Sequence, residues 1–272
     1  MAQNQPSKRE AKRISARERI QEAQRREEQA AKRRQRIVVT VSAVVVLALG
    51  GGVAIAINSA SGKDDKSSAA ASNAPLVVPA NASGPDGTVI TYGKADAPHT
   101  MEIYEDFRCP VCKHFEAANG QTVKALTQDG QIKVEFHLAA FLDKNLGGKG
   151  SRTALAAAGA ALNEGVDKFK AFHDVLYANQ PDERSDDFGD VNHLLDLAGQ
   201  VPGLKTDAFV KAVTDRTYAP WAAKVADAFN NSQVTGTPTV KVDGKTINVF
   251  AGNSAATPEQ FTAQVKQAAG LQ

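Results

Sequence analysis

The stretch Glu105-Asp106-Phe107-Arg108-Cys109-Pro110-Val111-Cys112-Lys113-His114-Phe115 contains both cysteines of the 272-residue chain. Two residues separate Cys109 from Cys112, and neither has another thiol in the chain with which to pair. The two cysteines are therefore partners of each other, or of something outside the protein.

Three chemistries use a CxxC pair: a zinc site, covalent haem attachment and reversible dithiol/disulfide exchange. A structural zinc needs about four ligands, but no second cysteine pair follows and the other histidines are scattered singly. Haem attachment needs His directly after the second cysteine, where this chain has Lys113. A structural disulfide over so short a loop removes little unfolded-state entropy. The pattern therefore favours redox exchange, with no metal and no cofactor besides a Cys109–Cys112 disulfide.

The residue between the cysteines that matters most is Pro110, which suits the first turn of a helix because its missing N–H has no partner there. Cys109 then lies at a helix N-terminus, where unpaired N–H groups and the macrodipole favour a thiolate. We expect the pKa of Cys109 to fall below the free-thiol value of about 8.5. Cys109 is the predicted attacking sulfur and Cys112, one turn deeper, the resolving sulfur. A stabilised thiolate makes the disulfide a stronger oxidant.

The N-terminal region has the pattern of a membrane anchor. Residues 1–36 carry 12 Lys or Arg against 5 Asp or Glu, and residues 37–57 contain no charge. As a helix this second stretch would be about 31 Å long, enough to cross a bilayer core. It is too long for the apolar part of a cleavable signal peptide. The positive-inside rule predicts a cytoplasmic tail, a transmembrane helix at 37–57, and the rest of the chain outside the cell membrane.

The remaining chain divides into a tether and one domain. Residues 58–86 are rich in Ser, Ala, Asn, Gly and Pro and are expected to be a flexible linker. Residues 87–272 are long enough for one domain with its own core. The formal charge of +2 is the sum of a basic tail and an acidic remainder. Residues 37–272 carry 20 basic and 25 acidic residues. Because the tail abuts a membrane span, lipid head groups are its expected partner, and not nucleic acid.

Periodicity within the domain predicts an α/β order. Strand patterns are expected at residues 88–92, 99–104, 131–138, 239–242 and 246–250. Helices are expected from Pro110 to about residue 127, across residues 151–231 with breaks near 179–181 and 201–203, and after Thr257. Asp243-Gly244 between the last two strands is a strong hairpin signal.

These elements resemble the DsbA-like branch of the thioredoxin superfamily, extracytoplasmic thiol-disulfide oxidoreductases. The resemblance rests on residues 105–112, on KFKAFHDVLY at 168–177 and on VTGTPT at 234–239. It implies a thioredoxin-like fold with an all-helical insertion at about 150–232. It also implies that Thr237-Pro238 is the cis-proline loop of that family, beside the two sulfurs.

The resemblance also implies a route for the proton of Cys112. Family members often have a buried acid six residues before the first cysteine, where this chain has Ile103. Glu105 or Asp106 is the candidate replacement, and Glu116 matches an acidic position of DsbA-like proteins. Arg108 is a candidate for stabilising the Cys109 thiolate, with a solvated loop cation as the alternative reading.

The dipeptide Pro110-Val111 does not indicate the direction of exchange, because it matches neither the dipeptide of reducing thioredoxins nor that of the strongest oxidants. The direction is therefore inferred from the expected location of the domain. Outside the membrane, clients arrive as reduced chains. We therefore expect a membrane-tethered oxidase of secreted or cell-envelope proteins, recycled by a DsbB- or VKOR-like membrane enzyme. The alternatives are a thiol reductase or isomerase, for example in cytochrome maturation, and a non-catalytic tethered chaperone-like or metal-handling module.

Overall fold

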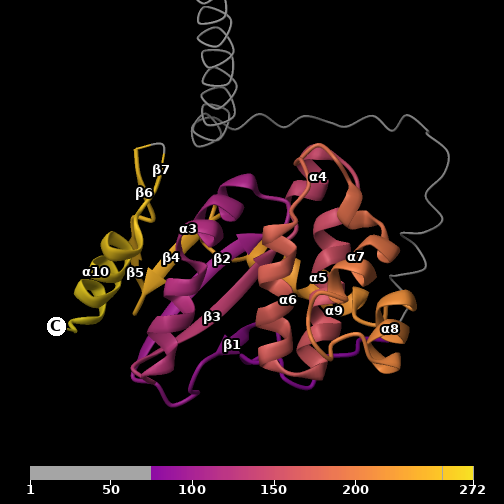
Figure 1. Ribbon diagram of the computed structural model, residues 1–272, viewed down its shortest axis with the longest axis horizontal. Coiled ribbons are helices and arrows are strands. Elements are labelled where there is room, and N and C mark those ends of the chain that lie inside the picture. Colours follow the sequence, from indigo (N-terminus) through magenta and orange to yellow (C-terminus); the bar gives the residue numbers. More distant parts are fainter. Residues whose placement is uncertain (1–74, 253, 272) are drawn as a thin grey trace, which may run out of the picture. The chain divides into compact units, whose positions relative to one another are not determined.

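A mixed sheet of five strands forms the centre of the computed structural model, which describes residues 75–252 and 254–271 (Figure 1). The strand order is β1-β3-β2-β4-β5, with β2 and β3 parallel and the other neighbours antiparallel. The strands are β1 (Ile90–Tyr92), β2 (His99–Asp106), β3 (Ile132–Ala139), β4 (Thr239–Val242) and β5 (Lys245–Ile247). The last residues of β2 lead directly into the cysteines, so the sheet fixes where the CxxC segment begins.

The alternation predicted for the third strand is confirmed in β3. Its apolar residues Ile132, Val134, Phe136 and Leu138 are buried, and the residues between them are half-buried. This period of two is what a strand needs when one face packs on a core. β3 pairs with β2 over its full length and therefore joins that strand to the hydrophobic core.

The hairpin between β4 and β5 is also confirmed, but the last predicted strand is only partly right. Asp243 and Gly244 both have positive φ, 48° and 76°, as a two-residue hairpin turn requires. β5 ends at Ile247, because the Asn248 N–H donates to Gln264 Oε1 instead of continuing the ladder. Phe250 instead begins β6 (Phe250–Ala251), which pairs with β7 (Ser254–Ala255) in a separate small sheet.

Two helices that lie side by side cover one part of the sheet, α3 (Pro110–Gln128) and α10 (Pro258–Ala269) (Figure 1). Phe115 of α3 meets Phe261 of α10 edge to face, with ring centroids 5.5 Å apart. The predicted start of α10 is confirmed, since Thr257 forms a capping box with Gln260. These contacts anchor the helix that carries Cys112.

The predicted helical insertion is confirmed between β3 and β4. Its helices are α4 (Leu142–Leu146), α5 (Gly150–Glu164), α6 (Val166–Ala178), α7 (Val191–Ala198), α8 (Asp207–Thr214) and α9 (Ala219–Asn230), with a 3-10 turn η2 at Asp187–Gly189. α5 and α9 approach closely at Gly159, where a Cβ atom would lie 2.7 Å from the Trp221 ring. Within this insertion α6 contacts both β1 and α3, so it reaches the side of the CxxC helix.

The N-terminal predictions fall mostly outside the described residues. The basic tail, the predicted membrane span and linker residues 58–74 belong to that part of the chain. The end of the predicted linker contacts the domain, because Ala80 N–H donates to Asn163 Oδ1 and Asn81 Nδ2 donates to the Leu162 carbonyl. Among the residues that the structure describes, no helix has both the length and the apolar character needed to span a membrane.

Candidate active site

The two cysteines lie in unequal places at the N-terminus of α3. Cys109 is the N-cap residue and Cys112 belongs to the first turn, which Pro110 begins. Both are free thiols, with 6% of Cys109 and 0% of Cys112 exposed. Val111 between them is 44% exposed. An approaching thiol therefore meets Cys109 before Cys112.

The loop before β4 lies against Cys109. The Thr237-Pro238 peptide bond is cis, and the Cys109 thiol donates to the Thr237 carbonyl across 3.5 Å. Residues 128 positions apart in sequence are thereby brought together. The structure thus places Thr237 and Pro238 where the family resemblance implies them to be.

The surroundings shift the pKa values of the two thiols in opposite directions. The pKa of Cys109 is lowered to about 7, because hydrogen bonding from the Cys112 thiol outweighs burial, with further contributions from the Thr237 side chain and from the N–H groups of Cys112 and Val111. The pKa of Cys112 is raised well above 9, mainly by burial, then by its interaction with Cys109 and by the charge of Glu105. One thiolate is therefore stabilised at the expense of the other.

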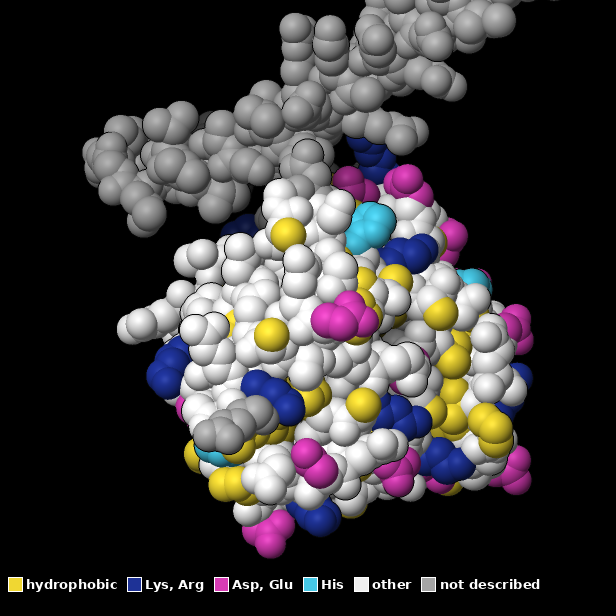
Figure 2. All heavy atoms as spheres, turned by 60° about the vertical axis from the view of Figure 1, so that its left-hand side comes forward, with side chains coloured by type: hydrophobic (Ala, Val, Ile, Leu, Met, Phe, Trp, Pro, Cys, Tyr) yellow, Lys and Arg dark blue, Asp and Glu magenta, His cyan; other side chains and the backbone are white. Residues whose placement is uncertain are grey.

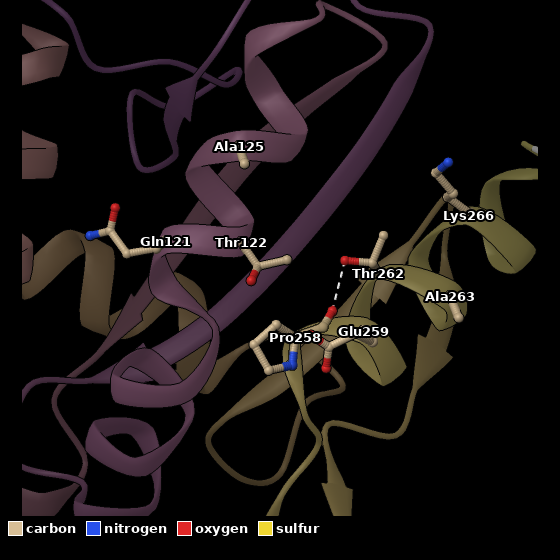
Figure 3. A pocket seen from close by; sticks show the side chains of 8 residues that line it. All are labelled: Gln121, Thr122, Ala125, Pro258, Glu259, Thr262, Ala263 and Lys266. Carbon is tan, nitrogen blue, oxygen red and sulfur yellow. Dashed lines mark hydrogen bonds between the residues drawn. The ribbon is translucent and has the colours of Figure 1, made fainter.

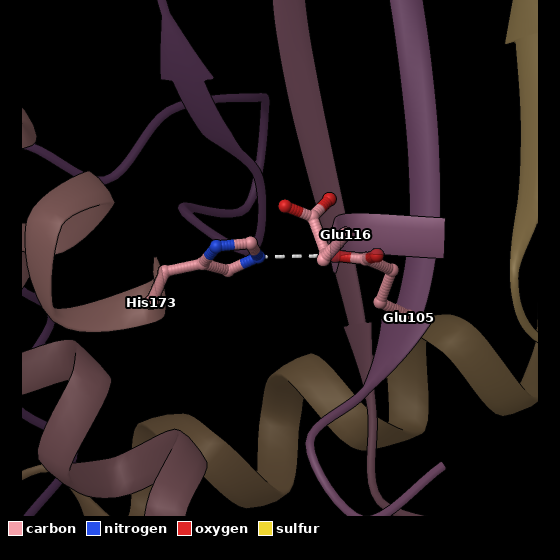
Figure 4. Close-up of side chains that lie close together, drawn as sticks. All are labelled: Glu105, Glu116 and His173. Carbon is pink, nitrogen blue, oxygen red and sulfur yellow. Dashed lines mark hydrogen bonds and ion pairs between the residues drawn. The ribbon is translucent and has the colours of Figure 1, made fainter. Parts of the chain in front are cut away.

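A buried cluster of ionisable groups lies near enough to Cys112 for the charge of Glu105 to raise the pKa of that thiol. One carboxylate oxygen each of Glu105 (β2) and Glu116 (α3) and one ring nitrogen of His173 (α6) lie within 4.8 Å of one another (Figure 4). His173 Nε2 lies 3.0 Å from Glu105 Oε2. Burial, and then the charge of Glu116, raise the pKa of Glu105 to about 8. A carboxyl group with such a pKa can exchange a proton near neutral pH.

The same three side chains have the composition of a small metal site, but the chain supplies a cation of its own. Lys170 Nζ of α6 lies 4.0 Å from Glu116 Oε2 and also pairs with Asp174. The charge of Glu116 contributes to a raised pKa of Lys170 despite burial. A buried ammonium at this distance opposes a divalent ion, so the cluster is better suited to holding protons than metal.

Asp106, a sequence candidate for the proton path, is used to shape the loop. Its Oδ1 accepts hydrogen bonds from the Arg108 N–H and the Ser151 hydroxyl, and its Oδ2 accepts from the Leu142 N–H. Burial raises its pKa to about 6 in spite of these bonds. All three partners lie toward the helical insertion or the loop itself.

Arg108 is buried, which excludes the reading as a solvated loop cation. Its guanidinium pairs with Asp143 at 3.0 Å and donates to the carbonyls of Gly147 and Glu183. The side chain therefore fastens the loop that carries Cys109 to the helical insertion.

A second fastening comes from the end of α6. Gln180 Nε2 donates to the carbonyls of Phe107 and Cys109, and its own carbonyl accepts from Lys113 Nζ. The backbone on both sides of Arg108 is thus held by residues of the insertion. The position of Cys109 depends on these contacts as well as on α3.

A shallow groove of about 620 Å³ lies elsewhere, between the second half of α3 and the start of α10 (Figure 3). Its lining includes Thr122, Ala125 and Ala263, and it does not include either cysteine. On the face shown in Figure 2, acidic and basic side chains are interspersed over the described surface. That face offers no extended basic surface of the kind that binds a phosphate backbone.

Sequence reasoning missed two members of the buried cluster, His173 and Lys170. They lie on α6 among Phe169, Phe172 and Leu176, which form its buried face. Two ionisable side chains at positions of helical spacing within an apolar face were the available signal. Glu105, in contrast, was a sequence candidate, and it shares a strand face with Ile103 because side chains two residues apart point the same way.

Comparisons with known proteins show which family the chain resembles. The model of the thioredoxin family matches residues 86–267. Disulfide bond formation protein D of Bacillus subtilis is 31% identical over 160 residues, covering 58% of this chain and 69% of that protein. Among solved structures, oxidised BdbD of Bacillus subtilis has a TM-score of 0.56 and 26% identity, covering 72% of this chain and 100% of that one. Reduced DsbA of Mycobacterium tuberculosis has a TM-score of 0.54 and 26% identity, covering 67% and 93%.

The fold, the CxxC helix and the family match define the class of the protein. The chain belongs to the thioredoxin family, as a DsbA-like thiol-disulfide oxidoreductase. Its described part is an α/β thioredoxin-like domain with a helical insertion, and its cysteine pair is Cys109 and Cys112.

Proposed function

We propose that this protein is a membrane-tethered disulfide oxidase that introduces disulfides into secreted or cell-envelope proteins. The observation that carries the proposal is the inequality of the two sulfurs. Cys109 is the more exposed and has a pKa lowered to about 7, whereas the pKa of the enclosed Cys112 is raised. Stabilising one thiolate favours the reduced enzyme, which makes its disulfide ready to be passed on.

The reaction begins with a client thiolate attacking Cys109 Sγ of the oxidised enzyme. The Cys109–Cys112 bond breaks, and Cys112 leaves with the electron pair and takes up a proton, for which Glu105 and Glu116 are the nearby acids. A second client thiolate then attacks the client sulfur of the mixed disulfide, and Cys109 leaves as a thiolate. The client is oxidised by two electrons and the enzyme is reduced by two. Val111, Thr237 and Pro238 border the sulfur that the client approaches.

The proposed location follows from the sequence. The uncharged stretch 37–57 would anchor the chain in lipid, with the basic tail in the cytoplasm and the thioredoxin-like domain outside. In that compartment client proteins need oxidation. A DsbB- or VKOR-like membrane enzyme would restore the Cys109–Cys112 disulfide after each cycle.

A thiol reductase is the second candidate, because a pKa of about 7 for Cys109 is close to that of thioredoxin, also about 7. Equilibration of the full chain with reduced and oxidised glutathione distinguishes the two. A reduction potential near about −120 mV supports the oxidase, and one near about −270 mV supports the reductase. The fraction of oxidised chain is measured by acid quenching, thiol labelling and mass spectrometry.

A further inference from the structure

Proton exchange at Cys112 faces a problem of access. Cys112 is fully buried, and a client joined to Cys109 would cover the sulfur next to it. Each catalytic cycle still requires one proton to reach Cys112 and one to leave it. A route that opens on another part of the surface would keep this exchange independent of the client.

His173 of α6 has the geometry of such a route. Its Nε2 lies 3.0 Å from Glu105 Oε2, and its Nδ1 lies 3.3 Å from Asp174 Oδ1. The side chains of Glu105 and His173 are 0% exposed, whereas that of Asp174 is 34% exposed. The imidazole therefore bridges a carboxyl group beside Cys112 and a carboxylate that reaches solvent.

An imidazole is suited to this position, because one ring nitrogen can accept a proton while the other releases one. The ring is enclosed by aromatic side chains with centroids 4.9 to 5.8 Å away, namely Phe107, Phe136, Phe169 and Tyr177. Because aromatic rings surround the imidazole, its described polar contacts are those of its two nitrogens, with Glu105 and Asp174. Through the imidazole, protons can then pass between Glu105 and Asp174.

We propose that His173 relays protons between Glu105 and Asp174, so that Cys112 exchanges its proton with solvent through α6. This inference rests on the proposed role of Glu105 as the acid beside Cys112. His173 is a positioning and relay residue, since its described contacts are with the acids and not with either sulfur.

When the enzyme disulfide is reduced, one proton moves along the relay for each Cys112 S–H bond that forms. The S–S bond breaks, and the Cys112 thiolate takes the proton of the Glu105 carboxyl group. The relay uses the neutral ring with its proton on Nε2: Glu105 takes that proton, and Nδ1, which is unprotonated at the start of the step, takes one from solvent by way of Asp174. One proton enters and one S–H bond forms. Reoxidation by a membrane partner reverses each transfer.

The charged groups around His173 support this role. Burial lowers the pKa of His173, but hydrogen bonds to Asp174 and Glu105 and the charge of Glu116 raise it to about 9, against the effect of Lys170. From the neighbouring elements, Glu105 of β2, Glu116 of α3, and Lys170, Asp174 and Tyr177 of α6 face the same buried space. These acids thus favour the uptake of a proton at Nδ1, and Glu105 holds a proton near neutral pH until Cys112 takes it.

Asp174→Asn is the first test, because Asp174 is partly exposed and its loss should spare the fold. The oxidised full chain is mixed with reduced, unfolded ribonuclease A, and disulfide transfer is followed by acid quenching in H2O and D2O. We expect transfer to slow by about tenfold or more with a larger solvent isotope effect, since a positioned proton donor contributes ~10²- to 10⁴-fold. The control is Asp215→Asn, which removes an equivalent i,i+4 ion pair, the one between Asp215 and Lys211 of α8. This control should transfer at the wild-type rate.

His173→Gln is the second test, with His137→Gln as its control. His137 is half-buried, stacks on Tyr104 with ring centroids 4.5 Å apart, and lies outside the cluster. We expect His173→Gln to slow transfer at least as much as Asp174→Asn, and His137→Gln to have no such effect. Circular dichroism and the alkylation rate of Cys109 establish that each variant is folded with a normal attacking thiol.

Three results would overturn the relay. Wild-type transfer rates and isotope effects in Asp174→Asn would exclude the exit through Asp174. A large defect in Lys170→Met without one in folded His173→Gln would assign the route to Glu116 and Lys170 instead. A normal rate in Glu105→Gln would remove the acid on which the relay rests. Failure of the oxidase proposal is separate, because it appears as a strongly reducing glutathione potential in the wild-type chain.

Discussion

Cys109 and Cys112 have the same side chain, and their neighbours alone make them different. Cys109 receives hydrogen bonds at the start of α3 and from the neighbouring thiol, so its thiolate is favoured. Cys112 has no exposed surface and lies beside the charge of Glu105, so its thiol is favoured. At the residue scale, exchange requires this division of roles between attack and resolution.

Alkylation of the reduced chain tests the division directly. Because the pKa of Cys109 is lowered to about 7, its thiolate is present above that pH and is lost as pH falls through 7. We expect the rate of labelling by iodoacetamide to have its midpoint near pH 7 and to fall about tenfold per unit below it. Peptide mass spectrometry should find Cys109 labelled and Cys112 unlabelled. A midpoint above about 8.5, the ordinary thiol value, or equal labelling of both, would contradict the account.

Sequence reasoning found the cysteine pair and the acids Glu105 and Glu116, but not His173 and Lys170 of α6, which lie against these acids. The spacing of Cys109 and Cys112 is local, so a sequence shows it. The contact between Glu105 and His173 joins residues 68 positions apart, and only the packing of α6 on β2 and α3 creates it. Arg108 was ambiguous for the same reason, since its partner Asp143 lies 35 positions away.

At the scale of elements, the helical insertion holds the catalytic loop through one buried ion pair. Arg108 and Asp143 both have 2% of their side chains exposed and lie 3.0 Å apart. Asp143 also accepts hydrogen bonds from the N–H groups of Ser151 and Arg152 at the start of α5. One carboxylate thus joins the loop, α4 and α5.

Arg108→Met should therefore destabilise the protein strongly. The substitution removes the buried cation that pairs with Asp143, and breaking a buried pair costs about 3 to 5 kcal/mol in free energy of unfolding. Arg152 pairs with the same carboxylate but is 58% exposed, so Arg152→Met should cost less than about 1 kcal/mol. Urea unfolding of both variants measures the difference. Equal effects would show that burial of the Arg108 pair has no special importance.

The close approach of α5 and α9 gives a second prediction at this scale. Helix propensity alone would make Gly159→Ala stabilising by about 1 kcal/mol. A Cβ atom at this position would lie 2.7 Å from the Trp221 ring and 3.2 Å from Tyr218 Cβ. We expect overpacking to dominate, with a net loss of about 1 kcal/mol or more in urea unfolding. Trp221→Leu should relieve the effect in the double variant, and a stabilised Gly159→Ala would refute the tight packing.

At the scale of the whole molecule, sequence periodicity predicted the individual strands and helices, but not how they pack together. The strand patterns, the hairpin at Asp243-Gly244 and the Thr257 cap are local signals, and the structure contains all of them except for the early end of β5. The strand order of the sheet has no local signal, since it depends on which strands pair across long connections. The family resemblance implied only a thioredoxin-like fold with a helical insertion, and the structure has that fold.

The charge of the full chain supports the proposed tether. Its 12 basic residues before position 37 precede the uncharged stretch 37–57, while the rest of the chain has an acidic excess. A basic segment next to a membrane span is attracted to anionic lipid. The whole molecule would then hold a redox domain near the membrane that contains its recycling partner.

The central claim is that Cys109 exchanges with the client and Cys112 resolves. Full-length Cys112→Ser and Cys109→Ser variants, each incubated with the same thiol client at equal concentration, test it by non-reducing electrophoresis and mass spectrometry of the trapped species. The account predicts a stable mixed disulfide through Cys109 in the Cys112→Ser variant, and little or none through Cys112 in the Cys109→Ser variant. Trapping through Cys112 and not through Cys109 would contradict it.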